Sequence, residues 1–252
     1  MTGAAAARWA ELQAGRGIPP EIVAAAPADP WTFDAHQFAA PEVPAPSPSR
    51  DAAAALLGDR GSVLDVGCGG GAAAFALERL TAVVGVDRQR DMLAQFTAAA
   101  ERRGVPCRTV AGAWPDAAPA AGPADVVLCH HVLHNVVDLP PFVAALTAAA
   151  RRGVVVEMFT EHPLAWLDPL WLRFHDLHRP RPATAEDAAA VLAELGVAPE
   201  VVTWERPTAP RQDAALATRR LCLPREREPE VAAALAELPA RSRRVATLSW
   251  RP

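Results

Sequence analysis

Apolar positions along the chain follow two alternating patterns, short continuous runs and longer stretches with the spacing of an amphipathic helix. The continuous runs are rich in β-branched residues and predict strands over residues 62–66, 82–86, 107–111, 124–129 and 153–157. The stretches beside them predict helices over residues 50–57, 72–80, 90–103 and 140–151. Because strands that alternate with helices are joined by crossover connections, the pattern predicts an α/β fold with a doubly wound, mostly parallel sheet.

The alternation changes after residue 157. Residues 161–182 are rich in Trp, His, Arg and Pro, and a helix is expected to begin at Thr184 and end at Gly196. Two last strands, over residues 200–206 and 244–250, complete an expected sheet of seven strands, with helices around residues 212–221 and 230–238 between them. We therefore expect a main domain over residues 51–252, with a substrate cap at residues 161–182.

The first fifty residues differ from the rest because they contain eight prolines, a spacing that stops long helices. One interpretation is a solvated N-terminal arm over residues 1–50. Trp9, Trp31, Phe33 and Phe38 favour a second interpretation, an arm packed on the main domain, because large apolar side chains are rare in segments that stay solvated. Trp31 and Phe33 could then close over a ligand as a lid.

Composition excludes several mechanisms. All 25 Lys+Arg positions are arginine, and the chain has 0 tyrosines. A Walker-type phosphate loop, a pyridoxal Schiff base and the Tyr/Lys pair of short-chain dehydrogenases are therefore excluded. The formal net charge of −4 gives no basic footprint for a nucleic acid.

Cysteine spacing and hydropathy indicate the compartment. The 4 cysteines lie far apart and form no C-x-x-C pair, which indicates neither a zinc knot nor a disulfide framework. No leader-like segment opens the chain, and no apolar run reaches the length of a membrane span. We expect a cytoplasmic protein with neither a membrane nor a nucleic-acid partner.

Candidate chemistry lies where the first two strands end, which is where open parallel sheets bind ligands. Asp65 precedes a glycine cluster at residues 67–71, and Asp87 ends the second strand. Glycines let the backbone approach a ligand closely, and a carboxylate after the second strand can accept both hydroxyls of a ribose. A nicotinamide or flavin dinucleotide is one candidate. Asp65 opposes a pyrophosphate and favours a ligand with an amino group.

These residues also carry a family resemblance. The segments 63–71, 84–87 and 91–93 resemble motifs I and II of class I S-adenosylmethionine-dependent methyltransferases, and residues 125–136 resemble the fourth-strand motif. The likeness covers residues 51–157, and the flanking segments resemble actinobacterial, small-molecule-type members whose substrates are mostly unassigned. It implies a Rossmann-like methyltransferase sheet with S-adenosyl-L-methionine as cofactor.

The resemblance implies a set of cofactor contacts. Asp65 would lie near the amino group, Asp87 would hold the ribose hydroxyls, and the backbone carbonyl of His130 would accept from the amino group. The other expected cofactor residues are Gly67, Gly69, Gly71, Arg88, Met92, Ala113 and Trp114. The chain departs from the family after the third strand, because residues 111–114 hold no acidic residue for the adenine amine. Trp114 could stack on the adenine or simply close the loop, and Asp116 could replace the missing carboxylate.

Histidines supply the remaining candidates. His131 and His134, three residues apart at the end of the fourth strand, are expected to be catalytic, with His131 as general base. No nearby carboxylate or cysteine completes a metal-ligand set, so no metal is expected. The candidate substrate residues are Trp31, His162, Trp166, Trp171 and His175. The apolar positions of 161–182 have helical spacing and could equally form a core.

The predicted function is transfer of a methyl group from S-adenosylmethionine to O, N or C of a small organic molecule, by a monomer or homodimer. Two alternatives remain open from the residues. One is an NAD(P)-binding oxidoreductase that uses the same glycine loop. The other is a non-catalytic protein that binds S-adenosylmethionine.

Overall fold

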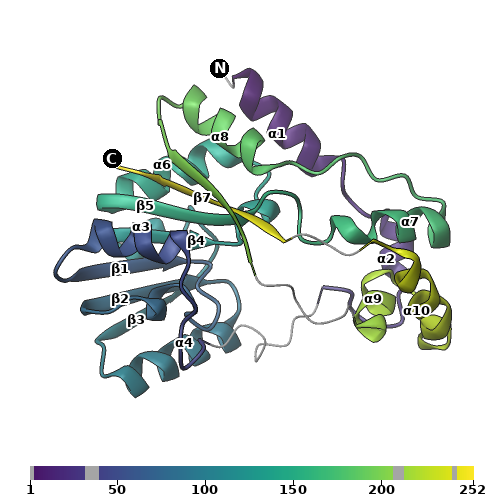
Figure 1. Ribbon diagram of the computed structural model, residues 1–252, viewed down its shortest axis with the longest axis horizontal. Coiled ribbons are helices and arrows are strands. Elements are labelled where there is room, and N and C mark those ends of the chain that lie inside the picture. The colour runs from purple at the N-terminus through teal and green to yellow at the C-terminus, as the bar shows by residue number, and fades with distance from the viewer. Residues whose placement is uncertain (1–2, 32–39, 207–212, 240–242) are drawn as a thin grey trace.

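A seven-stranded sheet in the order β3-β2-β1-β4-β5-β7-β6 organises the molecule (Figure 1). The computed structural model describes residues 3–31, 40–206, 213–239 and 243–252. The strands are β1 (Gly61–Val66), β2 (Leu80–Asp87), β3 (Cys107–Ala111), β4 (Ala124–His130), β5 (Ala150–Phe159), β6 (Glu200–Glu205) and β7 (Arg244–Trp250). The first five strands pair in parallel, and β7 is antiparallel to both β5 and β6. The predicted seven-stranded, mostly parallel sheet is confirmed.

Helices cover both faces of this sheet, and each face has its own core. One face packs on α3 (Pro48–Leu57) and α4 (Arg90–Arg103), around the buried side chains Leu57, Leu93 and Phe96. The other face packs on α1 (Ala4–Ala14), α6 (Leu139–Ala149) and α8 (Ala185–Glu194). The short helix α5 (Ala118–Ala121) precedes β4. Parallel strands buried on both faces explain the continuous apolar runs of the sequence.

The expected helix over residues 72–80 was wrong. The segment between β1 and β2 holds only a 3₁₀ turn, Ala74–Ala76. Phe75 is drawn into the core, where its ring centroid lies 4.9 Å from that of Phe96. Because β2 already begins at Leu80, too little chain remains after the glycine loop for a helix of several turns.

The N-terminal arm begins with α1, which precedes the first proline of the chain. Trp9 on α1 is completely buried, and its indole Nε1 donates to the carbonyl of Val136 at 2.8 Å. The Glu194 carboxylate of α8 accepts from the backbone N–H groups of Ala5 and Ala6 at the start of α1, where a negative charge favours a helix. This first part of the arm is therefore a layer of the main domain.

A second, smaller core lies beside the sheet, to the right in Figure 1. It joins α2 (Pro20–Ala24), α7 (Asp168–His175), α9 (Ala214–Arg220) and α10 (Glu228–Glu237) around buried Leu170, Trp171 and Leu221. We call these four helices the cap. They come from three separate segments, so the cap extends well beyond residues 161–182.

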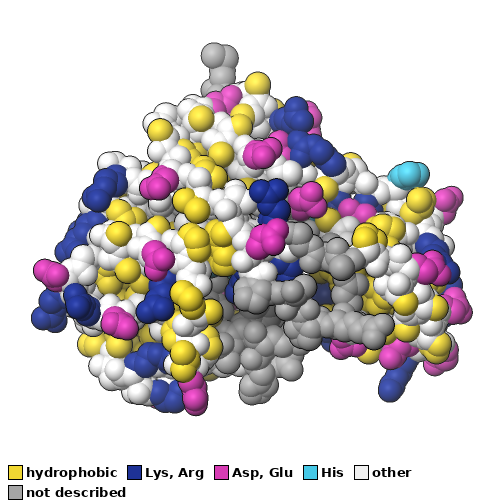
Figure 2. All heavy atoms as spheres, viewed as in Figure 1, with side chains coloured by type: hydrophobic (Ala, Val, Ile, Leu, Met, Phe, Trp, Pro, Cys, Tyr) yellow, Lys and Arg dark blue, Asp and Glu magenta, His cyan; other side chains and the backbone are white. Residues whose placement is uncertain are grey.

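Charges on the face in Figure 2 are interspersed, with acidic and basic side chains side by side and no broad patch of one sign. Among the described residues, no helix is long and apolar enough to cross a membrane.

Candidate functional site

The loop after β1 needs glycine for conformation and for space. Gly67, Gly69 and Gly71 have φ values of 71°, 51° and 89°, in the left-handed region that side chains disfavour. The amides of Gly67 and Cys68 both donate to the carbonyl of Val86 at the end of β2. A Cβ atom at Gly67 would lie 2.3 Å from Cγ2 of Val132, so the loop packs directly on the segment after β4.

Asp65 and Asp87 lie on either side of this loop. Asp87 accepts from the amide of Gly69 at 3.0 Å and from that of Gln89 at 2.9 Å, which fixes its carboxylate at the end of β2. Asp65 is 1% exposed and accepts from the amide of Ala74 at 3.2 Å. Burial, more than the nearby charge of Asp87, raises the pKa of Asp65 to about 7. A cationic ligand beside this carboxyl group would hold it ionised.

These features fit S-adenosylmethionine better than a dinucleotide. The buried, easily neutralised Asp65 suits an ammonium group, and Asp87 retains acceptor capacity for ribose hydroxyls. A pyrophosphate instead needs the amides and dipole of a helix N-terminus. Here the loop leads into a three-residue 3₁₀ turn.

The other predicted cofactor residues lie in different environments. Arg88 and Ala113 are exposed near the ends of β2 and β3, and Met92 is buried in α4. Trp114 donates its indole N–H to the carbonyl of Phe142 at 3.2 Å, as expected if it closes the loop. Asp116 is exposed.

His131 is held by two charged residues that sequence reasoning missed. Its Nε2 lies 2.9 Å from Oε1 of Glu157 and 2.9 Å from a guanidinium nitrogen of Arg206. That arginine nitrogen is 3.7 Å from the same carboxylate oxygen. His131 itself has a φ of 61°, a strained backbone for a residue with a side chain. Glu157 directly follows an apolar run in the sequence, as Asp87 does, so the same signal could have identified it. Arg206 carries no such signal.

This arrangement accommodates both protonation states of His131. A protonated Nε2 can donate to Glu157, and a bare Nε2 can accept from Arg206. Burial by itself would raise the pKa of Glu157, but the hydrogen bond from His131 and the neighbouring imidazoles lower it to about 2. Glu157 therefore stays ionised beside His131.

Burial keeps His130 and His134 neutral. Burial lowers the pKa of His130 to about 4, and burial together with His162 lowers that of His134 to about 3. The rings of His134 and His162 meet edge to face with centroids 5.4 Å apart. Burial and the charges of Arg16 and Arg179 lower the pKa of His162 to about 4. His134 is thus placed to pack between the sheet and residue 162.

Three of the remaining candidate substrate residues, Trp166, Trp171 and His175, lie in or against the cap core. Trp171 is buried in the cap core, and His175 packs on it while its Nε2 lies 2.6 Å from the carbonyl of Leu221. Trp166 packs against the same core. Trp31 is half exposed, and Phe33 lies outside the described residues.

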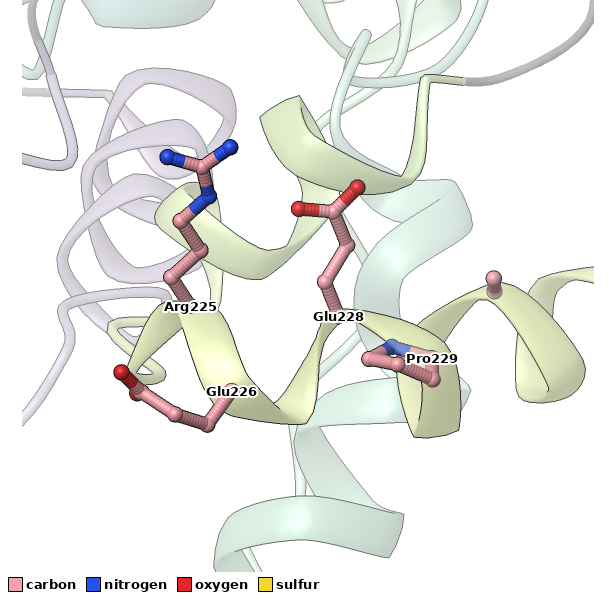
Figure 3. A pocket seen from close by; sticks show the side chains of 5 residues that line it. Arg225, Glu226, Glu228 and Pro229 are labelled. Atoms are coloured by element: carbon pink, nitrogen blue, oxygen red, sulfur yellow. The ribbon is translucent and has the colours of Figure 1, made fainter.

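A hollow on the cap is lined by Arg225, Glu226, Glu228, Pro229 and Ala232. In Figure 3 the side chains of Arg225 and Glu226 point away from each other. Polar groups that do not converge offer no specific ligand contacts, so this hollow is not a candidate site.

Comparison with known proteins agrees with the cofactor geometry. Residues 63–153 match a family model described as a methyltransferase domain. Within this segment the chain is similar to methyltransferase domains. The ubiquinone biosynthesis O-methyltransferase of Methylobacterium nodulans is 39% identical over 94 residues, which cover 36% of this chain and 37% of that relative. The segment 63–153 that matches the family model contains the glycine loop, Asp87, His131 and His134.

Solved structures share the fold of this chain. Magnesium protoporphyrin IX methyltransferase from Synechocystis, with bound S-adenosylhomocysteine, has a TM-score of 0.50 and 18% identity, covering 78% of this chain and 75% of that one. The [4+2]-cyclase SpnF has a TM-score of 0.51 and 16% identity, covering 78% and 76%. At these identities the likeness shows the fold alone.

Proposed function

We propose that this protein transfers a methyl group from S-adenosylmethionine to an oxygen, nitrogen or carbon atom of a small organic molecule. The observation that supports it best is the glycine loop with one carboxylate on each side, Asp65 and Asp87, inside the segment that matches the methyltransferase family. The O-methyltransferase named above supports an acceptor of small-molecule size.

Bound S-adenosylmethionine supplies an activated methyl group with a built-in leaving group. The residues of this chain then have to align the acceptor, exclude water and, where the acceptor is a hydroxyl group, remove its proton. Alignment of two reactants can contribute roughly 7 to 11 kcal/mol, and a positioned base about 10²- to 10⁴-fold in rate. His131 is the base we propose, with Glu157 to orient its ring and stabilise the imidazolium.

A second reading of the same fold has to be tested, because one structure similar to this chain is a [4+2]-cyclase. A protein can keep the cofactor site and carry out other chemistry or none. A dinucleotide oxidoreductase is disfavoured by the buried Asp65 and by the missing helix after the loop. The cytoplasmic location and the monomeric or homodimeric state remain predictions.

The test is calorimetry with S-adenosylhomocysteine on the full chain and on Asp87→Ala. We expect binding by the unmodified protein and a dissociation constant at least 100-fold larger for the variant. The variant loses the carboxylate proposed to bind both ribose hydroxyls, and it also loses the hydrogen bond from the Gly69 amide that supports the loop. Asp59→Ala, at an exposed carboxylate on the surface, is the matched control and should bind normally. No binding, or equal binding by all three proteins, contradicts the cofactor assignment.

A further inference from the structure

Arg243 lies against the histidine site and is not explained by the residues that surround it. Its guanidinium carbon is 4.9 Å from the ring centroid of Phe159, at the end of β5. The ring of His131 stacks on the same Phe159 ring, with the two centroids 4.7 Å apart. Arg243 thus shares Phe159 with the proposed base, although it precedes β7 and lies 112 positions further along the chain (243 − 131).

The charges around Arg243 are unbalanced. Burial lowers the pKa of Arg243, and the nearby charge of Arg206 lowers it further. Arg206 has a carboxylate, Glu157, within 3.7 Å, but within the described ranges no ion pair joins Arg243 to an acidic residue. Two neighbouring guanidinium groups, one of them half-buried and without a carboxylate, are costly unless an anion lies between or beside them.

A chain of contacts links this pair of cations to the glycine loop, where the cofactor is proposed to bind. Val132, which follows His131, packs on Gly67 in the glycine loop. The backbone also fixes the two arginines relative to one another, since the amide of Arg206 donates to the carbonyl of Arg243 at 3.2 Å. A group held by both guanidinium groups would therefore lie beside His131, on the side of the sheet formed by β5, β6 and β7.

We propose that Arg243, together with Arg206, binds an oxyanion of the methyl acceptor, so that the acceptor is a small organic acid. This inference rests on the methyl transfer proposed above and adds the acceptor class. Planar guanidinium groups bind carboxylates and phosphates with paired hydrogen bonds, which also fixes the orientation of the bound group. The acceptor atom would then be presented to the methyl donor while its acid group stays with the arginines.

The experiment measures binding of matched ligands to the protein saturated with S-adenosylhomocysteine. One arm holds hydroxybenzoates and short hydroxy acids, a second arm their uncharged amides, and a third arm phosphate monoesters of similar size. We expect the acids of the first or third arm to bind and the amides to bind at least 10-fold more weakly, and whichever arm binds identifies the oxyanion as carboxylate or phosphate. Amides that bind as well as the acids, or no acid that binds at 10 mM, would overturn the proposal.

Variants test whether acid binding depends on Arg243 itself and not on the loss of any surface arginine. Arg243→Gln should weaken binding of the acid by about 10- to 100-fold, the loss expected for one charge-assisted hydrogen bond. Arg243→Lys should recover only part of that affinity, because it keeps the charge and loses the paired hydrogen bonds. Arg225→Gln, on the exposed cap hollow, should change nothing. Acid binding that is equal in Arg243→Gln and Arg225→Gln contradicts the proposal.

The affinity for S-adenosylhomocysteine separates this proposal from the methyl transfer itself. We expect it to be the same in Arg243→Gln and in the unmodified protein. If it falls instead, the arginine holds the carboxylate of the cofactor and the acceptor assignment is wrong. If the unmodified protein does not bind S-adenosylhomocysteine at all, the proposed function fails first.

Discussion

The two halves of the candidate site are built in different ways. The cofactor half, at the ends of β1 and β2, is contiguous in the chain: Asp65, the glycine loop and Asp87 lie within 23 residues (65 to 87). The acceptor half, at the ends of β4 and β5, brings together His131, Glu157, Arg206 and Arg243. Local hydrogen bonds shape the first half, and long-range ion pairs and ring contacts shape the second.

The two halves also differ in the ionisation of their buried carboxyl groups. Asp65 in the cofactor half is a carboxyl group that burial drives toward its neutral form, whereas Glu157 in the acceptor half stays ionised beside His131. A cationic donor fits the first half, and an anionic acceptor fits the arginines of the second. If both proposals hold, one edge of the sheet binds two ligands of opposite charge side by side.

The largest expected effect is a loss of folding stability at the contact between Gly67 and Val132, where the two halves meet. Gly67→Ala should destabilise the protein by about 2 to 5 kcal/mol, because a left-handed alanine costs about 1 to 2 kcal/mol and the clash with Val132 about 1 to 3 more. Urea unfolding measures the loss. Gly104→Ala is the matched control, since Gly104 has a φ of 63° with nothing within 4 Å of its Cβ position. Equal losses in the two variants would show that the loop does not depend on its contact with Val132.

Acidification should change the stability contributions of Asp65 and His134 in opposite directions. The raised pKa of Asp65, about 7 in the folded protein against 3.8, means that the folded state binds the extra proton, so stability is gained as pH falls from 7 to 5. The lowered pKa of His134, about 3 against 6.5, means that the unfolded state binds the extra proton, so stability is lost over the same range. Each contribution is about 2 kcal/mol between pH 7 and pH 5.

The two variants Asp65→Asn and His134→Gln test these signs. Between pH 7 and pH 5, Asp65→Asn should lose about 2 kcal/mol more unfolding free energy than the unmodified protein, and His134→Gln about 2 kcal/mol less. Denaturant unfolding at both pH values measures the differences. His178→Gln, at an exposed histidine, should follow the unmodified protein. Identical pH responses in all four proteins would mean that neither group titrates differently on folding.

The smallest expected effect concerns the segment that carries His134. The side-chain amide of Gln13 on α1 donates to the carbonyls of Leu133, His134 and Val136 at 3.0 to 3.2 Å. Gln13→Ala should cost about 1 kcal/mol of stability and lower kcat for whichever acceptor is identified, with the affinity for S-adenosylhomocysteine unchanged. Glu11→Ala, exposed on the same helix, is the control. A lower affinity for S-adenosylhomocysteine with an unchanged kcat would instead show that Gln13 supports the cofactor half.

Much of the sheet could be predicted from the chain alone, because apolar runs and glycine positions act over short distances. The strands, α4 and the two aspartates of the cofactor half were predicted from local patterns, and the structure places them at one edge of the sheet. The helix at 72–80 was wrong because an alanine-rich stretch has helical propensity, while packing of Phe75 on Phe96 decided its conformation.

The sequence by itself determined the place where a nucleoside-type ligand is proposed to bind, since that site needs only two strand ends and the glycines between them. Only the tertiary structure decided the partners of His131, the burial of His134 and the position of Arg243. The β7 strand inserts between β5 and β6 and runs opposite to β5, and this brings residues from the last part of the chain beside the fourth strand. No local pattern encodes that insertion, because its stability comes from contacts between residues far apart in the sequence.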